Sequence, residues 1–151
     1  MFNLSRRPAR CAGLFFVLLA SFPALGVPGA VIIERAWART SVINTGAVYL
    51  TLRNAGPTPS TLTGIDCAPL GACMMHESRE HDGMTSMVML DKLVIAAGAS
   101  ASFLPRGKHI MVEELKKPLL EGTAFPITLH FREIPDMQVQ IHVSRQEPEG
   151  N

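Results

Sequence analysis

Hydrophobic and polar residues alternate along several short stretches of the chain. Apolar side chains occupy every second position in residues 127–131 and 137–143, and again in residues 48–52. Neighbouring side chains of an extended strand point to opposite faces of a sheet, so a period of two predicts strands with one buried and one exposed face. Prolines and glycines recur at short intervals between such stretches, as at the turns of all-β proteins. The pattern therefore predicts an all-β domain, built as a β-sandwich or a β-barrel.

Helix is expected to be scarce. Beyond the N-terminal region no stretch keeps a helical period, and the one helical turn that we predict lies near residues 113–116. The chain shows no internal repeat, low-complexity tract or interdomain linker. A single domain is expected.

The first 26 residues have the features of a secretory signal peptide. Three arginines precede an apolar stretch at residues 12–20, and the small residues Ala24 and Gly26 follow it. We expect cleavage after Gly26, with cleavage after Ala30 as the alternative. The apolar stretch is shorter than the roughly 20 residues of a membrane-spanning helix, and no second long apolar stretch follows. The sequence thus predicts a signal peptide at 1–26, with no membrane span after its removal.

The predicted location is the periplasm. Arg6 and Arg7 resemble a twin-arginine signal, but Pro8 and Ala9 replace the hydrophobic residues that usually follow such a pair, so we expect general secretory export. Residues 27–151 then form one domain, a length that suits a single hydrophobic core.

The charge balance excludes several classes of function. The formal net charge is +1 at pH 7, and no block of like charge stands out. Such a chain has no field that would attract nucleic acid or anionic lipid. It also shows no nucleophile elbow, no paired carboxylates in a suggestive context and no phosphate-binding glycine loop. We therefore expect neither nucleic-acid binding nor an enzyme.

Two cysteines remain once the signal peptide, with Cys11, is removed. Cys67 and Cys73 are separated by a short segment with the turn-forming residues Pro69 and Gly71. In an oxidising compartment an even pair predicts a disulfide. The alternative is that Cys73, three residues before His76, supplies a thiolate or a redox step.

Methionines and histidines crowd into one part of the chain. Six of the eight methionines and three of the five histidines fall between residues 74 and 111. A thioether-rich core with surface histidines is one interpretation, because methionine often fills cores. Around Ile110, however, His109 and Met111 share the face opposite to the aliphatic one. Residues two apart on a strand lie about 6.6 Å apart at the backbone, so both side chains can reach one ion.

The chemistry of thioethers and imidazoles favours Cu(I). Soft ligands of this kind select a soft cation, whereas calcium and magnesium require carboxylate oxygens. Thioethers need no deprotonation, and unlike thiols they are not lost to disulfides in an oxidising compartment. A methionine-rich site therefore suits copper handling outside the cytoplasm.

The ligand pattern and its flanks resemble the periplasmic copper chaperones of the PCuAC family. The family pattern H-x10-M-x21-H-x-M is matched without adjustment by His76, Met87, His109 and Met111. The flanking sequences WAR at 37–39, GAVYLTLRNAG at 46–56, DG at 82–83 and LKKPLLEG at 115–122 are also similar. The resemblance covers nearly the whole chain after the signal peptide, and its four spaced ligands are far more specific than a single HxM.

The resemblance implies a fold, a site and a function. The fold is a cupredoxin-like Greek-key β-sandwich or barrel, and the site is a solvent-accessible Cu(I) site with one ion per chain. The function is delivery of copper to an acceptor protein, such as subunit II of cytochrome c oxidase with its dinuclear copper centre, or a thiol-based assembly factor. Some members carry a His- and Met-rich tail with a second copper site, whereas this chain ends in SRQEPEGN. We predict one site on a monomer.

The other histidines and methionines, and the lone tryptophan, are not assigned as copper ligands. His130 and His142 fall on the polar faces of their strands and are expected to be exposed. Auxiliary roles in copper binding stay open for His81, Met84 and Met89. The neighbours Met74 and Met75 are expected to pack, as is the lone Trp37, whose indole N–H needs a partner if it is buried.

Two other functions stay open. A blue-copper electron-transfer protein could share the fold, but it needs a cysteine thiolate with two histidines and a weak methionine ligand, and no cysteine follows Cys73. A β-sandwich binding module without metal is the second alternative. An intense blue colour on addition of Cu(II) would favour the first alternative, and a copper titration tests the second.

Overall fold

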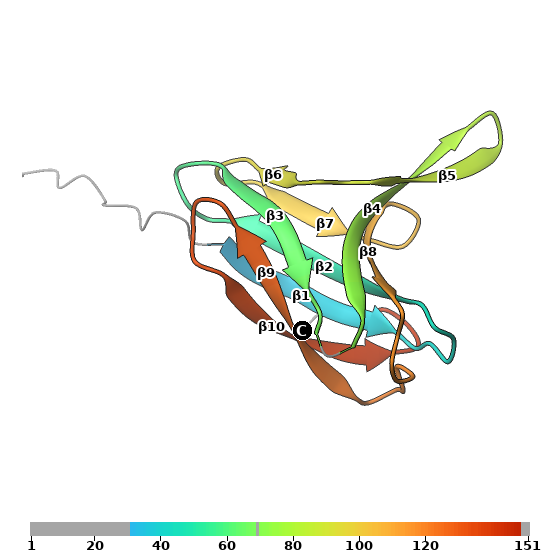
Figure 1. Ribbon diagram of the computed structural model, residues 1–151. Helices are drawn as coiled ribbons and strands as arrows, with labels where there is room; N and C mark the ends of the chain where they lie inside the picture. Colours follow the sequence, from blue (N-terminus) through green and yellow to red (C-terminus); the bar gives the residue numbers. More distant parts are fainter. Residues whose placement is uncertain (1–30, 69, 149–151) are drawn as a thin grey trace, which may run out of the picture.

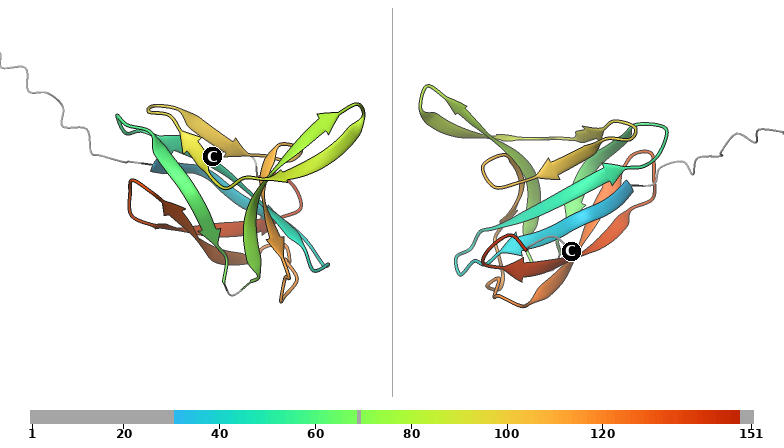
Figure 2. Two further views of the ribbon diagram at one scale, coloured as in Figure 1. Left: turned by 45° about the horizontal axis from the view of Figure 1, so that its top comes forward. Right: turned by 180° about the vertical axis from the view of Figure 1, so that it is seen from behind.

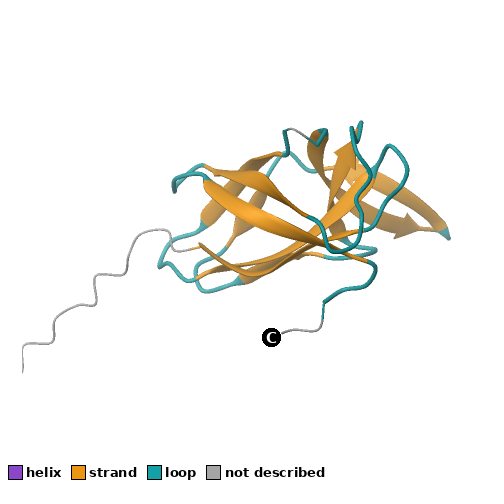
Figure 3. Ribbon diagram, turned by 90° about the horizontal axis from the view of Figure 1, so that it is seen from below, coloured by secondary structure: helices purple, strands orange, loops and turns teal. Residues whose placement is uncertain are grey.

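Ten strands make up the fold (Figure 1). The computed structural model describes residues 31–68 and 70–148, so the predicted signal peptide at 1–26 lies outside the described residues. In chain order the strands are β1 (Val31–Arg39), β2 (Gly46–Asn54), β3 (Ser60–Asp66), β4 (Ala72–His81), β5 (Met84–Met89), β6 (Leu93–Ile95), β7 (Ser100–Phe103), β8 (Lys108–Glu113), β9 (Ala124–Phe131) and β10 (Met137–Ser144). Figure 3 shows only strands and loops in the described part of the chain. The all-β prediction is confirmed.

The strands form one curled sheet that does not close. Its order is β5-β4-β8-β2-β1-β10-β9-β3-β6, and β7 pairs with β2 beside this path. β1 and β10 run parallel, whereas the other pairs are antiparallel. Figure 2 shows the sheet wrapping around one interior, with β5 and β6 as its free edges. The result is an open β-barrel of the cupredoxin-like kind that the sequence predicted.

The interior is filled by alternate residues of the strands. The three alternating stretches identified in the sequence lie in β2, β9 and β10, and their apolar positions are buried with one exception, the half-buried Met137. In β8, Ile110 and Val112 are fully buried, whereas His109 and Met111 on the other face are only partly so. Burying each aliphatic side chain of this size stabilises the fold by about 1.5–3 kcal/mol. The face of β8 that carries the candidate ligands is therefore free of any packing role in the core.

The β4–β5 hairpin extends beyond the body of the barrel (Figure 1). All six residues of β5 are exposed, and among the described strands this edge strand pairs only with β4. Its turn is Asp82-Gly83, and both residues have left-handed φ angles, 51° and 74°. Asp-Gly is a favoured pair for a tight two-residue hairpin of this conformation. The local sequence thus sets the register in which β5 returns beside β4.

A disulfide links the end of β3 to β4 across the gap where the barrel stays open. Cys67 follows β3 and Cys73 lies in β4, with 5.7 Å between their Cα atoms. β3 and β4 share no ladder of hydrogen bonds. The segment between the cysteines passes close to the end of β8, since a Cβ on Gly71 would lie 2.2 Å from the carbonyl oxygen of Glu113. The covalent link and this close approach hold the start of β4 against its neighbours.

The helical turn predicted near residues 113–116 is wrong. Glu113 ends β8, and Glu114 takes a left-handed φ of 53°, which a right-handed helix cannot contain. The backbone N–H groups of Leu115 and Lys116 donate to the carbonyl oxygens of Asn44 and Leu70. These long-range bonds replace the local bonds of a helix. Within residues 31–68 and 70–148, no helix has the length and apolar character that a bilayer crossing requires.

Candidate metal centre

Three adjacent strands bring the four candidate ligands to one outer face of the barrel. His76 in β4 stands directly opposite His109 in β8, and Met111 stands two residues further along β8. In the β4–β5 pair, Met87 stands opposite Ser78, two residues from His76. Side chains at paired positions, and at positions two apart, share one face of a sheet. Histidines and methionines that are far apart in the sequence therefore meet on the face turned away from the core.

His109 is oriented for binding through Nε2. Its Nδ1 lies 3.0 Å from the carbonyl oxygen of Gly107. A carbonyl oxygen only accepts hydrogen bonds, so Nδ1 carries the proton and donates to it. Nε2 is then left with a free lone pair, as in metal sites where a backbone carbonyl fixes the ligand tautomer. The tight turn before β8 thus prepares His109 as a ligand.

His76 supplies a second free imidazole. Its ring centroid lies 6.0 Å from that of His109, with 43° between the two planes. Its Nδ1 is buried and has no hydrogen-bond partner among the described residues. A buried nitrogen without a partner costs roughly 1–3 kcal/mol, a cost that a bound ion coordinated by this ring would offset. The donor set therefore fits a metal ion between the two rings.

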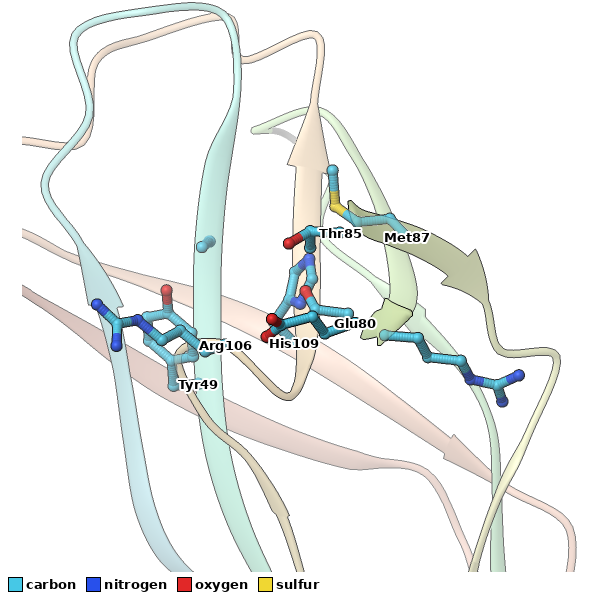
Figure 4. A pocket seen from close by; sticks show the side chains of 9 residues that line it. Tyr49, Glu80, Thr85, Met87, Arg106 and His109 are labelled. Carbon is cyan, nitrogen blue, oxygen red and sulfur yellow. The ribbon is translucent and has the colours of Figure 1, made fainter. Parts of the chain in front are cut away.

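Three of the four candidate ligands, Met87, His109 and Met111, border two hollows on this face, whereas His76 lines neither. One, of about 570 Å³, is lined by Met87 and His109 together with Tyr49 and Arg106. The other, of about 290 Å³, is lined by Met87, His109 and Met111. Figure 4 shows the larger hollow, with Met87 and Thr85 from β5 beside His109. Met87 is 60% exposed, so the site is open to solvent and to an approaching partner.

Further thioethers flank the four candidate ligands. Met89 stands opposite His76, and Met74 stands opposite Met111, so both belong to the ligand face by register. The expected packing holds for Met75, which is 5% exposed, but is wrong for Met74, which is only partly buried. Consecutive residues of a strand cannot both face the core. Met84 lies at the exposed tip of the hairpin, opposite His81.

The composition of the site favours a soft metal ion. No group of three or more histidines, cysteines, aspartates or glutamates that could hold a metal occurs in the described part of the chain. A zinc, calcium or magnesium site would need such a group. Two imidazoles with several thioethers match the ligands that Cu(I) prefers.

Charged groups around the hollows are of two kinds. Glu77 lies 2.8 Å from Arg79 and 3.2 Å from Lys108, and hydrogen bonds from these two cations lower the pKa of its carboxyl group. Arg39 and Arg106, in contrast, each line one of the two hollows, and neither forms an ion pair with another described residue. Burial raises the pKa of Tyr49, and the nearby charge of Arg39 partly offsets this. Glu80 also lines the larger hollow and forms no ion pair among the described residues, so the rim carries two unpaired arginines and one unpaired carboxylate.

The sequence did not identify Tyr49, Arg39 and Arg106 as residues that line the hollows beside the candidate ligands. Each stands on a polar position of a strand or turn, and only the pairing of β1, β2 and β8 brings it beside His109. Trp37 is buried as predicted and packs against Tyr49, with 4.7 Å between the ring centroids and 40° between the ring planes. Its indole nitrogen has no hydrogen-bond partner among the described residues.

The other predicted histidines lie elsewhere. The side chain of His81 is 90% exposed at the hairpin tip, 3.3 Å from Asp82. His142 is exposed on β10, and His130 is partly exposed, with Nδ1 2.8 Å from a carboxylate oxygen of Asp136. None of the three lines the hollows around His109.

By its fold and site, this protein is an open, cupredoxin-like β-barrel with a solvent-exposed cluster of imidazoles and thioethers on its outer face. The chain belongs to the LpqE-like family, whose sequence model, described as "Putative lipoprotein LpqE-like", matches residues 31–143. A relative in this class is protein RP573 of Rickettsia prowazekii (strain Madrid E), which is 27% identical over 130 residues, 82% of this chain and 72% of that protein.

Two solved structures show the same architecture. The "Copper-bound PCuAC domain from PmoF2" superposes with a TM-score of 0.65 at 19% identity, over 80% of this chain and 97% of that one. The "Solution structure of CuI-DR1885 from Deinococcus Radiodurans" has a TM-score of 0.57 at 28% identity, over 81% and 82% of the two chains. With the family match, these similarities confirm the assignment to the PCuAC family.

Proposed function

We propose that this protein is an exported copper carrier that binds one Cu(I) through His76, Met87, His109 and Met111 and passes it to an acceptor protein. The signal peptide at 1–26 would direct it to the periplasm, where the remaining domain acts as a monomer and without catalysis. The acceptor would be another copper protein, such as subunit II of cytochrome c oxidase or a thiol-based assembly factor.

The observation that carries the proposal is the meeting of imidazoles and thioethers across three strands. His76 and His109 are paired in register, and Met87, His109 and Met111 line one hollow. One nitrogen of each ring is free of hydrogen bonds, Nε2 of His109 by its tautomer and Nδ1 of His76 by the absence of a partner in the described chain. Such a donor set suits Cu(I) and leaves the ion accessible.

Similar proteins support the choice of metal. Among the solved structures that share the fold, one is named as copper-bound and another as the Cu(I) form. A carrier must also release its cargo, which an exposed edge strand favours, because an incoming ligand can replace Met87 without disturbing the core.

An anaerobic Cu(I) competition titration tests the proposal. The protein should bind one equivalent, and each of the single variants His76→Ala, Met87→Ala, His109→Ala and Met111→Ala should bind more weakly by at least about tenfold, because Cu(I) loses one of its donors. Binding that is unchanged in all four variants would refute the site.

The blue-copper alternative is not favoured by the structure. Such a site needs a thiolate, and the two cysteines in the described part of the chain are joined to each other. An intense blue colour on addition of Cu(II) would reverse this conclusion.

A further inference from the structure

Two arginines line the hollows beside the candidate copper site. Arg39 at the end of β1 lines the hollow with Met87, His109 and Met111. Arg106, in the turn between β7 and β8, lines the adjoining hollow with Met87 and His109. Figure 4 shows Arg106 beside Tyr49, facing the hollow from the side opposite to Met87.

Neither arginine forms an ion pair within the described chain, and the one carboxylate that lines the hollows, that of Glu80, is outnumbered by the two guanidinium groups. Arg79 and Lys108, the other cations nearby, share the carboxylate of Glu77. No hydrogen bond or ion pair of Arg39 or Arg106 with a side chain is present among the described residues. Exposed cations beside a concave site attract anionic groups over about 10 Å at moderate ionic strength.

The backbone at Arg106 is strained. Its φ is 66°, in the left-handed region that costs a non-glycine residue about 1 kcal/mol or more. The next residue, Gly107, would take this conformation more readily, yet the arginine occupies it. Strained residues concentrate at functional sites, where the position of the side chain matters more than local stability.

Apolar side chains extend the same rim. In the β1–β2 loop, Val42 and Ile43 are 80% and 66% exposed, while their neighbours Ser41 and Thr45 line the hollow beside Met111. Hydrogen bonds from Ser41 to Leu119 and to Thr45 hold the base of this loop. Exposed aliphatic residues next to arginines are typical of protein–protein contacts, and a free anion would not bury them.

We propose that Arg39 and Arg106 dock an acidic segment of the copper acceptor, next to the acceptor's own metal ligands. The proposal rests on the proposed function and adds the chemistry of the partner. The arginines hold carboxylates of the acceptor, while the β1–β2 loop covers an apolar part of it. Both contacts bring the acceptor's ligands to the exposed side of the site, where they replace the thioethers of this protein on the same Cu(I) ion, with no change in its oxidation state.

Transfer to two matched peptides tests the proposal. Both are synthetic and carry the same His and Met ligands for Cu(I) and the same leucines, but one is flanked by aspartates and the other by lysines. Stopped-flow rates of transfer from the Cu(I)-loaded protein should favour the aspartate peptide by roughly tenfold at low salt, and the preference should vanish near 0.5 M salt. The double variant Arg39→Gln/Arg106→Gln should lose the preference at low salt.

Controls separate this proposal from the proposed function. Arg132→Gln removes an exposed charge in the β9–β10 turn and should keep the preference. The double arginine variant should still bind one Cu(I) with unchanged affinity, whereas a wild-type protein that binds no Cu(I) would contradict the proposed function itself. Equal preference in wild type and double variant would overturn the docking role, as would a loss of Cu(I) affinity in the double variant.

A separate variant tests the contact that the β1–β2 loop is proposed to make with the acceptor. Val42→Ser/Ile43→Ser should slow transfer to the aspartate peptide severalfold at both salt concentrations, because burial of apolar surface is not screened by salt. Unchanged rates would restrict the rim to anion binding and contradict a protein partner.

Discussion

At the scale of single residues, the site depends on side chains that have no part in the core. His109 and Met111 alternate with the fully buried Ile110 and Val112, so the same short strand serves packing on one face and ligation on the other. The hydrogen bond from His109 to Gly107 shows how one backbone carbonyl determines which ring nitrogen is available.

The double variant His109→Ala/Met111→Ala should abolish Cu(I) binding and leave the fold intact. Both side chains lie on the outer face, so their truncation opens no cavity in the core. The measurements are a Cu(I) titration and a far-ultraviolet circular dichroism spectrum. His142→Ala, on the exposed face of β10, serves as the control and should bind normally. Retained binding in the double variant would show that the ligands lie elsewhere.

Gly71→Ala should lower the free energy of unfolding by roughly 1–3 kcal/mol, because its new Cβ would lie 2.2 Å from the carbonyl oxygen of Glu113 and backbone must move. Chemical denaturation measures the loss. Gly64→Ala is the matched control, since its Cβ would meet only ordinary contacts at 3.7 Å or more. Equal stability of the two variants would contradict the close approach.

At the scale of strands, two links tie β3 to other segments of the barrel. One is the disulfide between Cys67 and Cys73. The other is Glu133, whose carboxylate accepts hydrogen bonds from the backbone N–H of Thr61 at 2.6 Å and from its hydroxyl at 2.9 Å. The disulfide spans the gap, because β3 and β4 share no hydrogen-bonded ladder, whereas Glu133 follows β9, the strand that pairs with β3.

Removal of the disulfide by Cys67→Ala/Cys73→Ala should destabilise the protein by about 2 kcal/mol, because the short loop it closes gains freedom in the unfolded state. Cu(I) binding should persist with one equivalent, since no cysteine belongs to the proposed ligand set. Denaturation and Cu(I) titration of the variant check both statements. Loss of the copper equivalent, in a variant that is still folded, would instead favour a thiolate role for Cys73.

Glu133→Gln should reduce the dependence of stability on acid pH. The backbone N–H of Thr61, bonded to the carboxylate, lowers the pKa of Glu133. The charged form is therefore favoured in the folded state. Its stabilisation is complete above the ordinary glutamate pKa of about 4.3 and disappears as the pH falls through the lowered value. Melting temperatures between pH 7 and pH 3 should fall less steeply in the variant than in wild type. Glu121→Gln, which removes only an exposed pair with Arg145, should leave the profile unchanged.

At the scale of the whole molecule, the barrel and the hairpin have different roles. The buried residues of the barrel form one core, whereas β5 is exposed along its whole length and carries one candidate ligand, Met87. A metal ion held by β4, β5 and β8 together would tie this edge strand to the body (Figure 1).

Cu(I) should therefore raise the melting temperature and slow amide exchange in β5. A ligand present at a hundred times its dissociation constant stabilises the folded state by about 2.7 kcal/mol, a shift on the order of 10 °C for a domain of this size. Calorimetry and hydrogen exchange of the apo and Cu(I) forms measure the two effects. In Met87→Ala the protection of β5 should be lost while other strands keep theirs. Protection that is the same in the two proteins would place the ion away from β5.

The sequence by itself determined the elements and the ligand types. Alternation in β2, β9 and β10 predicted strands because the period of two is a local property of extended chain. The four spaced ligands identified the family, which the family match and the shared fold confirm. The helical turn near residue 114 was the local prediction that failed, since its backbone bonds to distant segments.

Only the tertiary structure decided which residues meet. The pairing of His76 with His109 and the approach of Arg39 and Arg106 to the ligands depend on contacts between distant segments. Strand pairing is set by the packing of the whole core. The sequence next to one strand therefore does not determine which other strand will pair with it.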